Sequence, residues 1–335
     1  VLAGDPVGDI FVVTNRWIPI LAGNNALLAM DHILDEDYYQ SLPGMHPQMR
    51  ETYSSYQGKA YGISVNGSFQ RNMDIGASQG WIYNRDIFAK AGLVTPNELL
   101  KTNEWTWATM QEAAIKLTED TNGDGQIDQW GVGGRLDPWP IEQEMATYAN
   151  GGGIMKERDG KMVFALADED SVEAMQLWRD LVQVEGVVMI GDKYDVRTEF
   201  NKKTLTQFRL DLLALPDHAN VVDFDYGYVF FPKGPRAQDY VNPVWGMDVA
   251  LLPITSEEPE VMVEIVNALF QTTGEYRDLS EYENDFLEFF MQSVRDRASL
   301  EVIRQMLYKV RLWDNIPNLS ADLDLRLRQA WGEAA

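Results

Sequence analysis

The chain has 335 residues, which is more than one hydrophobic core usually serves, so we expect two domains. Its 52 acidic and 28 basic residues give a formal net charge of −24, and a surface of this sign repels nucleic acid and anionic membranes. Cysteine is absent, which excludes disulfide scaffolds, cysteine-based zinc sites and thiol catalysis. No apolar run in the sequence approaches the roughly 20 residues that a membrane-spanning helix needs.

Two short stretches near the start of the chain have the pattern of buried strands, residues 9–14 and residues 58–65. In open α/β sheets, ligands lie beyond the carboxyl ends of the strands. The residues that follow these two strands are therefore ligand candidates, and they are Asn15, Trp17, Asn66 and Ser68. Two plainer interpretations stay open, because Trp17 can pack against a neighbouring helix and the Asn66–Gly67 pair can be an ordinary turn.

Strands and helices alternate through the rest of the chain. Residues 80–88 have the pattern of a strand that leads directly into a helix. Residues 106–119 form an amphipathic helix with Thr106 as its N-cap. Residues 170–184 form another helix, and its apolar stripe includes Trp178, which makes Trp178 a core residue. Further strands are predicted at residues 129–133, 225–231 and 245–252, and further helices at residues 261–272 and beyond residue 279.

The loop at residues 120–131 has the spacing of an EF-hand calcium loop, with Gly125 at the position where such a loop turns sharply. Ca²⁺ takes about six to eight oxygen ligands. The predicted ligands are the side chains of Asp120, Asn122, Asp124 and Asp128 and the backbone carbonyl of Gln126. Gly131 replaces the usual final glutamate, so a further oxygen must come from Asp128 itself, from Gln129, from water or from elsewhere in the chain. A metal-free turn rich in glycine, asparagine and aspartate is the alternative.

No catalytic motif is evident in the sequence. The histidines share no metal-ligand spacing, and the chain contains no nucleophile elbow, P-loop or dinucleotide-binding glycine motif. It does contain ten tryptophans and fourteen tyrosines, and aromatic faces beside polar side chains are suited to bind sugars. Because carboxylates are abundant, a pair at glycosidase spacing is not excluded, and a calcium-dependent polysaccharide-degrading enzyme stays open as an alternative.

Five stretches carry a family resemblance, and in chain order they are residues 81–93 (WIYNRDIFAKAGL), residues 105–107 (WTW), residues 120–131 (DTNGDGQIDQWG), residues 230–235 (FFPKGP) and the helix after Pro259. Together they resemble the extracellular solute-binding proteins of bacterial ABC importers, the family of sugar receptors related to maltose-binding protein. The resemblance covers the chain from about Gly4 to the late helices. It implies an α/β fold of the periplasmic-binding-protein type, with two lobes, a hinge and an interlobe ligand cleft.

The resemblance also implies where the chain crosses between the lobes. The first lobe would consist of residues 1–83 and 246–300, and the second of residues 84–245, which include the calcium loop. Residues 301–335 would form C-terminal helices that pack across both lobes. Besides the four residues after the first strands, the ligand-facing residues implied on this basis are Trp81, Trp139, Arg209, Asp211, Trp245 and Asp248.

The implied function is that of an extracytoplasmic receptor that binds an oligosaccharide and delivers it to the transmembrane subunits of an ABC permease, without being an enzyme. We expect a monomer, in the periplasm or on the cell surface as a lipid-anchored protein, with calcium as a structural ion away from the ligand. A receptor for a non-sugar solute on the same fold is an alternative. The family opens with a strand and a long helix before the equivalent of Gly4, so we expect such residues to precede Val1.

The net charge does not choose between a neutral and an acidic sugar. Local placement of arginine decides this question, because a guanidinium group near the ligand favours a negative charge on it. The arginines concerned are Arg71, Arg135 and Arg209, and sequence alone does not position them.

Overall fold

The computed structural model describes residues 7–35, 37, 39, 54–64, 78–135, 141–159, 161–184, 186–244, 246, 248–270, 279–312 and 326. The chain divides into two compact units, each of which is described by itself below. Unit 1 consists of Val1–Ser78 and Val244–Phe289, and unit 2 of Gln79–Pro243 and Phe290–Ala335. Among the helices that the structure describes, none has the length and apolar character to cross a membrane.

Unit 1 contains a three-stranded antiparallel sheet, and its strands in spatial order are β1 (Phe11–Thr14), β13 (Asp248–Leu251) and β4 (Gly62–Ser64). Thr14 pairs with Asp248, and Ser64 pairs with Val249. Because β13 runs opposite to both neighbours, one edge of the sheet is the place where β1 and β4 end and β13 begins.

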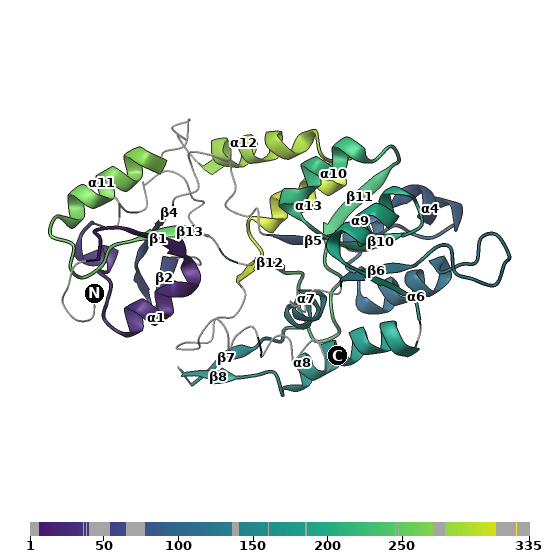
Figure 1. Ribbon diagram of the computed structural model, residues 1–335, viewed down its shortest axis with the longest axis horizontal. Coiled ribbons are helices and arrows are strands. Elements are labelled where there is room, and N and C mark those ends of the chain that lie inside the picture. Colours follow the sequence, from purple (N-terminus) through teal and green to yellow (C-terminus); the bar gives the residue numbers. More distant parts are fainter. Residues whose placement is uncertain are drawn as a thin grey trace. The chain divides into compact units, whose positions relative to one another are not determined.

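Helices cover both faces of this sheet because β13 is apolar on both. Val249 and Leu251 pack against α1 (Ile18–Gly23). Ala250 and Leu252 pack against α11 (Pro259–Phe270) on the other face, as the period of two along a strand requires. Figure 1 shows α1 and α11 on opposite sides of the sheet, so the described part of unit 1 has three α/β/α layers.

Unit 2 is built on a five-stranded mixed sheet, and its strands in spatial order are β11 (Tyr226–Phe230), β5 (Gln79–Asn84), β10 (Gln207–Asp211), β6 (Val132–Arg135) and β9 (Val188–Gly191). β5 is antiparallel to both of its neighbours, whereas β10, β6 and β9 are parallel to one another. The amino end of β5 therefore lies at the same edge as the carboxyl ends of β10, β6 and β9. In parallel α/β sheets ligands bind at this edge, which we call the ligand edge of unit 2.

The two most distinct helices of unit 2 form where the sequence predicts them. α6 (Trp107–Leu117) starts after its predicted N-cap, since the Thr106 hydroxyl accepts a hydrogen bond from the Thr109 N–H. α8 (Glu169–Arg179) buries Trp178, which is 5% exposed. A Cβ on Gly134 of β6 would lie 3.1 Å from the Trp178 ring, so this indole packs directly on the sheet. The core role predicted for Trp178 is confirmed.

The other described elements are η1 (Asn15–Trp17), η2 (Met30–His32), β2 (Ser55–Tyr56), β3 (Lys59–Ala60), α4 (Arg85–Lys90), α5 (Pro96–Lys101), α7 (Ile141–Ala149), β7 (Met155–Arg158), β8 (Lys161–Phe164), η4 (Asp180–Val184), α9 (Lys193–Asn201), η5 (Leu212–Ala214), α10 (Leu215–Val221), β12 (Asn242–Val244), α12 (Leu279–Met291), α13 (Arg297–Met306) and β14 (Val310–Leu312).

Some predicted boundaries differ from those in the structure. The strand predicted at 129–133 begins only at Val132, because Gln129 still closes the preceding loop through backbone hydrogen bonds with Glu119. The first unit boundary falls at residue 79 rather than 84, because β5 pairs along its length with β10 and β11. α13 lies on β11, where the Tyr228 N–H donates to Ser299 Oγ at 2.9 Å, so this part of the C-terminal segment belongs to unit 2.

A histidine is buried among aromatic side chains in unit 2. His218, on α10, is 3% exposed, and its ring centroid lies 5.3 Å from that of Phe200 and 6.0 Å from that of Phe208. Its Nε2 has no hydrogen-bond partner among the residues that the structure describes. Burial, together with the positive charge of Arg197, lowers the pKa of His218 to about 4. The folded state therefore holds this imidazole neutral.

We predict that His218 makes the protein sensitive to mild acid. The unfolded chain titrates this group near 6.5 and the folded protein near 4, so the unfolded state binds more protons between these pH values. As the pH falls through this window, the free energy of unfolding should fall by up to about 3 kcal/mol on account of His218. Urea unfolding at about pH 7 and about pH 4.5 measures the change.

The matched control is the exposed His32. In the H218L variant this part of the pH dependence should be absent, whereas H32Q should behave like the unaltered protein. An equal pH dependence in the unaltered protein and in H218L would contradict the assignment.

Candidate ligand-binding site

In unit 1, three of the predicted ligand residues lie at the edge where β1 ends and β13 begins. Asn15 and Trp17 are on η1, directly after β1, and Asp248 is the first residue of β13. Asn15 is buried, whereas Asp248 is exposed and Trp17 is 47% exposed. Gly246 has a φ of +139°, and a Cβ there would lie 2.6 Å from Asn15 Oδ1. An exposed indole beside polar groups is a surface on which a sugar ring can stack.

Several predicted positions lie outside the described residues: Asn66, Ser68, Arg71, Trp139 and Trp245. The assignment of Asn66, Ser68, Trp139 and Trp245 as ligand residues stays a prediction, and Arg71 stays unplaced. The described part of β4, which precedes Asn66 in the sequence, ends with Ser64 beside Val249, at the same edge of the sheet as Asn15.

The structure does not support the ligand-stacking role that the resemblance implied for Trp81. This residue lies inside β5, which has a neighbouring strand on each side, and it has an exposed fraction of 0%. Its indole N–H donates to Gln207 Oε1 at 2.8 Å, and its ring packs edge-on against Phe231 with centroids 5.1 Å apart. Trp81 is therefore a core residue of unit 2, because its polar and apolar surfaces are already in contact with neighbours.

At the ligand edge of unit 2, Arg209 is the centre of a buried polar network. Its Nη1 donates to Asp211 Oδ1 at 3.0 Å and to Gln79 Oε1, and its Nε donates to Glu142 Oε1 at 3.3 Å. Gln79 donates in turn from Nε2 to Asp211 Oδ1 at 2.6 Å. The side chains of Arg209 and Glu142 are each 2% exposed, so almost no water reaches their ion pair. The network joins β5, β10 and α7.

Two further guanidinium groups lie at this network. Arg135 is the last residue of β6 and is half-buried. Arg197, on α9, places Nη2 3.8 Å from Asp211 Oδ2, and the side chains of Arg197 and Asp211 are 28% and 33% exposed. The network therefore has a buried base, formed by Arg209, Glu142 and Gln79, and a partly exposed rim, formed by Arg135, Arg197 and Asp211.

The charges of the rim act on one another. Burial opposes ionisation of Asp211, but Arg209, the hydrogen bond from Gln79 and the charges of Arg135 and Arg197 outweigh it, so the pKa of Asp211 is lowered. For Arg135, burial and then the like charge of Arg209 lower the pKa, against the opposing effect of Glu142 and Asp211. Asp211 is thus ionised at neutral pH, and Arg135 is a cation beside other cations.

Sequence analysis predicted two members of this network as ligand residues, Arg209 and Asp211, named Arg135 without placing it, and missed the others. Arg209 is too deeply buried to contact a ligand, and it holds Asp211 in place instead. Gln79 and Arg135 stand at strand ends, which is the signal that could have found Gln79 and placed Arg135. Glu142 and Arg197 lie on helices, and the sequence does not say which side of a helix faces the end of a sheet.

The predicted calcium loop folds around Asp120. Asp120 Oδ1 accepts hydrogen bonds from the N–H groups of Gly123 at 2.6 Å and Asp124 at 3.3 Å, and Oδ2 accepts one from Gly125 at 2.7 Å. Gly123 and Gly125 have φ values of +81° and +88°, which glycine adopts readily. The backbone N–H of Gly125, followed by those of its neighbours, lowers the pKa of Asp120 despite the opposing effect of desolvation.

The other predicted metal ligands are also hydrogen-bonded within the loop. Asp128 accepts from the backbone N–H groups of Thr121 at 3.0 Å and Asn122 at 3.1 Å, and Asp124 accepts from the N–H of Gln126 at 2.9 Å. The side-chain amide of Gln129 donates to Leu117 O at 2.8 Å, at the end of α6. Within the described ranges, no three acidic or histidine side chains gather as they would around a metal. The backbone turns like a calcium loop, but its carboxylates do not converge.

Gly131, the twelfth residue of the loop, has a steric role. A Cβ at this position would lie 2.0 Å from the backbone oxygen of Ala114 in α6. No side chain fits there, so the glutamate that an EF-hand carries at this point is excluded by the close approach of the loop to the helix. The loop is consequently tied to α6 at both Gln129 and Gly131.

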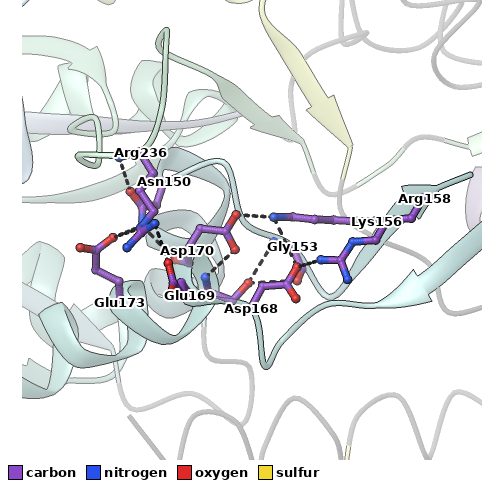
Figure 2. A network of polar contacts seen from close by, with 10 residues as sticks. Asn150, Gly153, Lys156, Arg158, Asp168, Glu169, Asp170, Glu173 and Arg236 are labelled. Atoms are coloured by element: carbon purple, nitrogen blue, oxygen red, sulfur yellow. Dashed lines mark hydrogen bonds and ion pairs between the residues drawn. The ribbon is translucent and has the colours of Figure 1, made fainter.

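Figure 2 shows a second polar network of unit 2, around the first turn of α8. Lys156 of β7 pairs with Asp170, and its Nζ is 3.7 Å from Asp168 Oδ2. Arg236 donates from Nε to Glu173 Oε2 at 2.8 Å. Acidic residues are favourable at a helix N-terminus, and here they also attach the β7–β8 hairpin to the helix. Because these charges pair with one another, we assign the network a structural role.

We predict that the buried ion pair at the ligand edge is needed for stability. The R209M variant leaves Glu142 buried without its charge partner and should lower the free energy of unfolding by about 3–5 kcal/mol. The R209M/E142M double variant should lose less than the sum of the two single variants, because it buries no unpaired carboxylate. Urea unfolding measures all three, with R179Q at the exposed Arg179 as control. Additive losses would contradict the coupling.

Comparisons with known proteins agree with this fold. Lmo0181, an ABC substrate-binding protein from Listeria monocytogenes in complex with cycloalternan, aligns with a TM-score of 0.66 at 16% identity, over 99% of this chain and 81% of that one. UspC from M. tuberculosis gives 0.68 at 18% identity, over 100% and 88%. The maltose/maltodextrin-binding domain MalE from Bdellovibrio bacteriovorus, bound to maltotriose, gives 0.61 at 18% identity, over 97% and 82%.

These alignments confirm the predicted α/β fold of the periplasmic-binding-protein type. The sequence itself matches the family model of the bacterial extracellular solute-binding proteins over residues 1–271. Since the match covers most of the chain, this protein belongs to the bacterial extracellular solute-binding protein family.

Proposed function

We propose that this protein is an extracytoplasmic receptor that binds an oligosaccharide and delivers it to the permease of an ABC importer. Membership of the solute-binding family is the observation that carries the proposal. The alignments to proteins solved with cycloalternan and maltotriose support a sugar as the solute. Trp17 and Asp248 are exposed at the same edge of the sheet in unit 1. With the polar rim of Arg135, Arg197 and Asp211 in unit 2, they offer stacking and hydrogen-bonding groups of the kind sugars need.

The chemistry of the ligand edge favours binding over hydrolysis. A glycosidase needs one carboxylic acid that keeps its proton near neutral pH, beside a second, ionised carboxylate. The pKa of Asp211 is lowered, so this side chain is not suited to donate a proton, and the carboxylate of Glu142 is engaged in its buried ion pair with Arg209. The polysaccharide-degrading enzyme is therefore the weaker alternative.

We further propose that the protein works as a monomer, in the periplasm or attached to the cell surface by a lipid. The strongly acidic composition supports the monomeric state, because copies of the chain with a net charge of −24 repel one another.

Calcium is proposed as a structural ion of the loop at residues 120–131. The loop backbone and the two left-handed glycines support the proposal, while the carboxylates would have to turn from the loop N–H groups toward the ion. The ion would be held by the side chains of Asp120, Asn122, Asp124 and Asp128 and by the carbonyl of Gln126. The side chain of Gln129 would keep its hydrogen bond to the last carbonyl of α6. A bound cation would neutralise the acidic loop and fix it against the end of α6.

We predict saturable binding of an oligosaccharide without turnover. Isothermal titration against a panel of neutral and acidic oligosaccharides should give a dissociation constant of about 1 μM or below for at least one of them, with the sugar recovered intact. No binding to any oligosaccharide of the panel would refute a sugar ligand, and release of reducing ends would instead favour the enzyme.

Trp17 provides a test of the surface in unit 1. The W17A variant should fold normally, because nearly half of the residue's surface is exposed, but it should weaken sugar binding by about 1–3 kcal/mol through loss of stacking. Phe164 is likewise exposed and serves as the matched control, so F164A should bind as the unaltered protein does. Unchanged affinity in W17A would place the ligand elsewhere.

Calcium should raise the melting temperature while leaving sugar affinity nearly unchanged. At a calcium concentration of about 100 times its dissociation constant, the expected shift is about 5–10 °C relative to the chelated protein. The shift should disappear in the D124A variant, which removes a predicted ligand at an exposed position. Identical melting curves with calcium and with chelator would show that the loop is a metal-free turn.

A further inference from the structure

An exposed tyrosine lies at the ligand edge of unit 2. α9 begins one residue after β9, whose carboxyl end is at this edge, and Tyr194 is the second residue of the helix. Tyr194 is 65% exposed, whereas Val196 and Phe200 of the same helix are buried in the core. The ammonium group of Lys193 lies over the ring, with Nζ 4.9 Å from its centroid. One face of the ring thus has a neighbour on the helix, and most of the residue is open to a bound molecule.

The backbone of Tyr194 is fixed by a capping box at the start of α9. Asp192 Oδ1 accepts hydrogen bonds from the N–H groups of Tyr194 at 2.6 Å and Asp195 at 2.9 Å. Asp195 Oδ2 in turn accepts a hydrogen bond from the Asp192 N–H at 3.3 Å. Such reciprocal hydrogen bonds hold the first turn of a helix. The exposed ring is therefore carried by an anchored turn.

A polar donor and a polar acceptor lie beside this tyrosine. Arg197 follows Tyr194 by three positions on α9, and residues three apart are neighbours on a helix surface. Its Nη2 lies 3.8 Å from Asp211 Oδ2, which is an ion-pair distance but longer than the roughly 2.7–3.2 Å of an N–H···O hydrogen bond. Asp211 accepts hydrogen bonds from Arg209 and Gln79 at its other oxygen, Oδ1. In the described part of this edge, Oδ2 thus faces the guanidinium group of Arg197 with no hydrogen bond between them.

We propose that Tyr194, Arg197 and Asp211 form a binding site for one sugar ring that carries two adjacent hydroxyl groups. This inference rests on the proposed sugar-binding function and specifies the part of the sugar that unit 2 recognises. The C–H face of the ring stacks on Tyr194, which offers a large aromatic surface. One of the two hydroxyls accepts a hydrogen bond from Arg197 Nη2, and the other donates one to Asp211 Oδ2.

The geometry of a sugar ring suits this arrangement. A pyranose that lies flat on an aromatic ring directs its equatorial hydroxyls outward around its edge, so two adjacent hydroxyls point to the same side. Each hydroxyl is both a donor and an acceptor, so the pair satisfies Arg197 and Asp211 together. Because the pKa of Asp211 is lowered, its carboxylate is ionised at neutral pH and accepts hydrogen bonds only. Both bonds to the sugar then involve a charged group, which makes them stronger than bonds between neutral groups.

The experiment removes the adjacent hydroxyls from a sugar probe. The probes are the methyl glycosides of the 1,4-linked trimers of glucose, galactose and mannose, each compared with an analogue that lacks the 3-hydroxyl on every ring. Without this hydroxyl, no two neighbouring carbons of the trimer both carry a free hydroxyl. Isothermal titration should show that the tightest-binding trimer binds at least about tenfold more tightly than its 3-deoxy analogue.

Variants then connect this difference to the residues of the site. R197Q should weaken binding of the trimer by about tenfold while changing that of the 3-deoxy analogue little, because the analogue has lost the partner of the guanidinium group. Y194A should weaken binding of both probes by about tenfold, whereas Y194F should bind both as the unaltered protein does, because stacking needs the ring and not its hydroxyl.

Two variants elsewhere in unit 2 are the matched controls. R179Q removes an exposed guanidinium group that pairs with its neighbour Asp180, and F164A removes an exposed aromatic ring. Neither should change the affinity for either probe. Melting curves of all variants report whether a loss of affinity reflects a loss of fold.

The outcomes separate this inference from the proposed function. Equal affinity for the trimer and its 3-deoxy analogue, an equal loss of both in R197Q, or unchanged affinity in Y194A would overturn the inference and leave a sugar receptor. If no trimer binds, the variants are measured with the tightest binder of the wider oligosaccharide panel, and unchanged affinity in Y194A and R197Q overturns the inference in the same way. No binding of any trimer or of any panel member would overturn the proposed function and the inference with it.

Discussion

A guanidinium group with almost no exposed surface has to be neutralised where it stands, and Arg209 imposes this requirement on the ligand edge of unit 2. Its partners come from three different elements: Glu142 from α7, Gln79 from β5 and Asp211 from β10 itself. The network forms only if the register of β5 on β10 and the position of α7 are both correct. The buried ion pair thereby links the packing of the core to the geometry of the surface above it.

Local patterns in the sequence predicted the helices and strands, whereas pairing between distant segments determined which residues lie at the candidate site. The cap at Thr106 and the buried stripe containing Trp178 depend on residues within a few positions, so spacing alone revealed them. Trp81 was assigned to the ligand because the lobes implied by the resemblance place it at the cleft, yet the pairing of β5 with two neighbours encloses its ring. Arg209 was predicted to face the ligand, but in the structure it is a buried support, and this role depends on Glu142, 67 positions away in the sequence.

In the loop at residues 120–131, the glycine that replaces the usual final glutamate of a calcium loop is explained by contact with another element. In the sequence, Gly131 is a missing calcium ligand. In the structure it is the point at which the loop passes α6 so closely that the Ala114 carbonyl occupies the space of a side chain. The helix end, capped by Gln129 through the Leu117 carbonyl, is thus fastened by the protein itself, and a cation would add to an attachment that already exists. This favours a role in stability, since the loop enters β6 at its amino end, whereas the ligand edge lies at the carboxyl end of that strand.

The arginine rim is held rigidly because of the strand beneath it. β6 carries Gly133 and Gly134, where a Cβ would lie 2.8 Å from Val196 on α9 and 3.1 Å from Trp178 on α8, respectively. Both helices therefore press directly on the backbone that precedes Arg135, and α9 brings Arg197 with it. The packing of both helices thus fixes the backbone at the carboxyl end of β6. The same two glycines that allow the core of unit 2 to pack also set how closely α8 and α9 approach this strand.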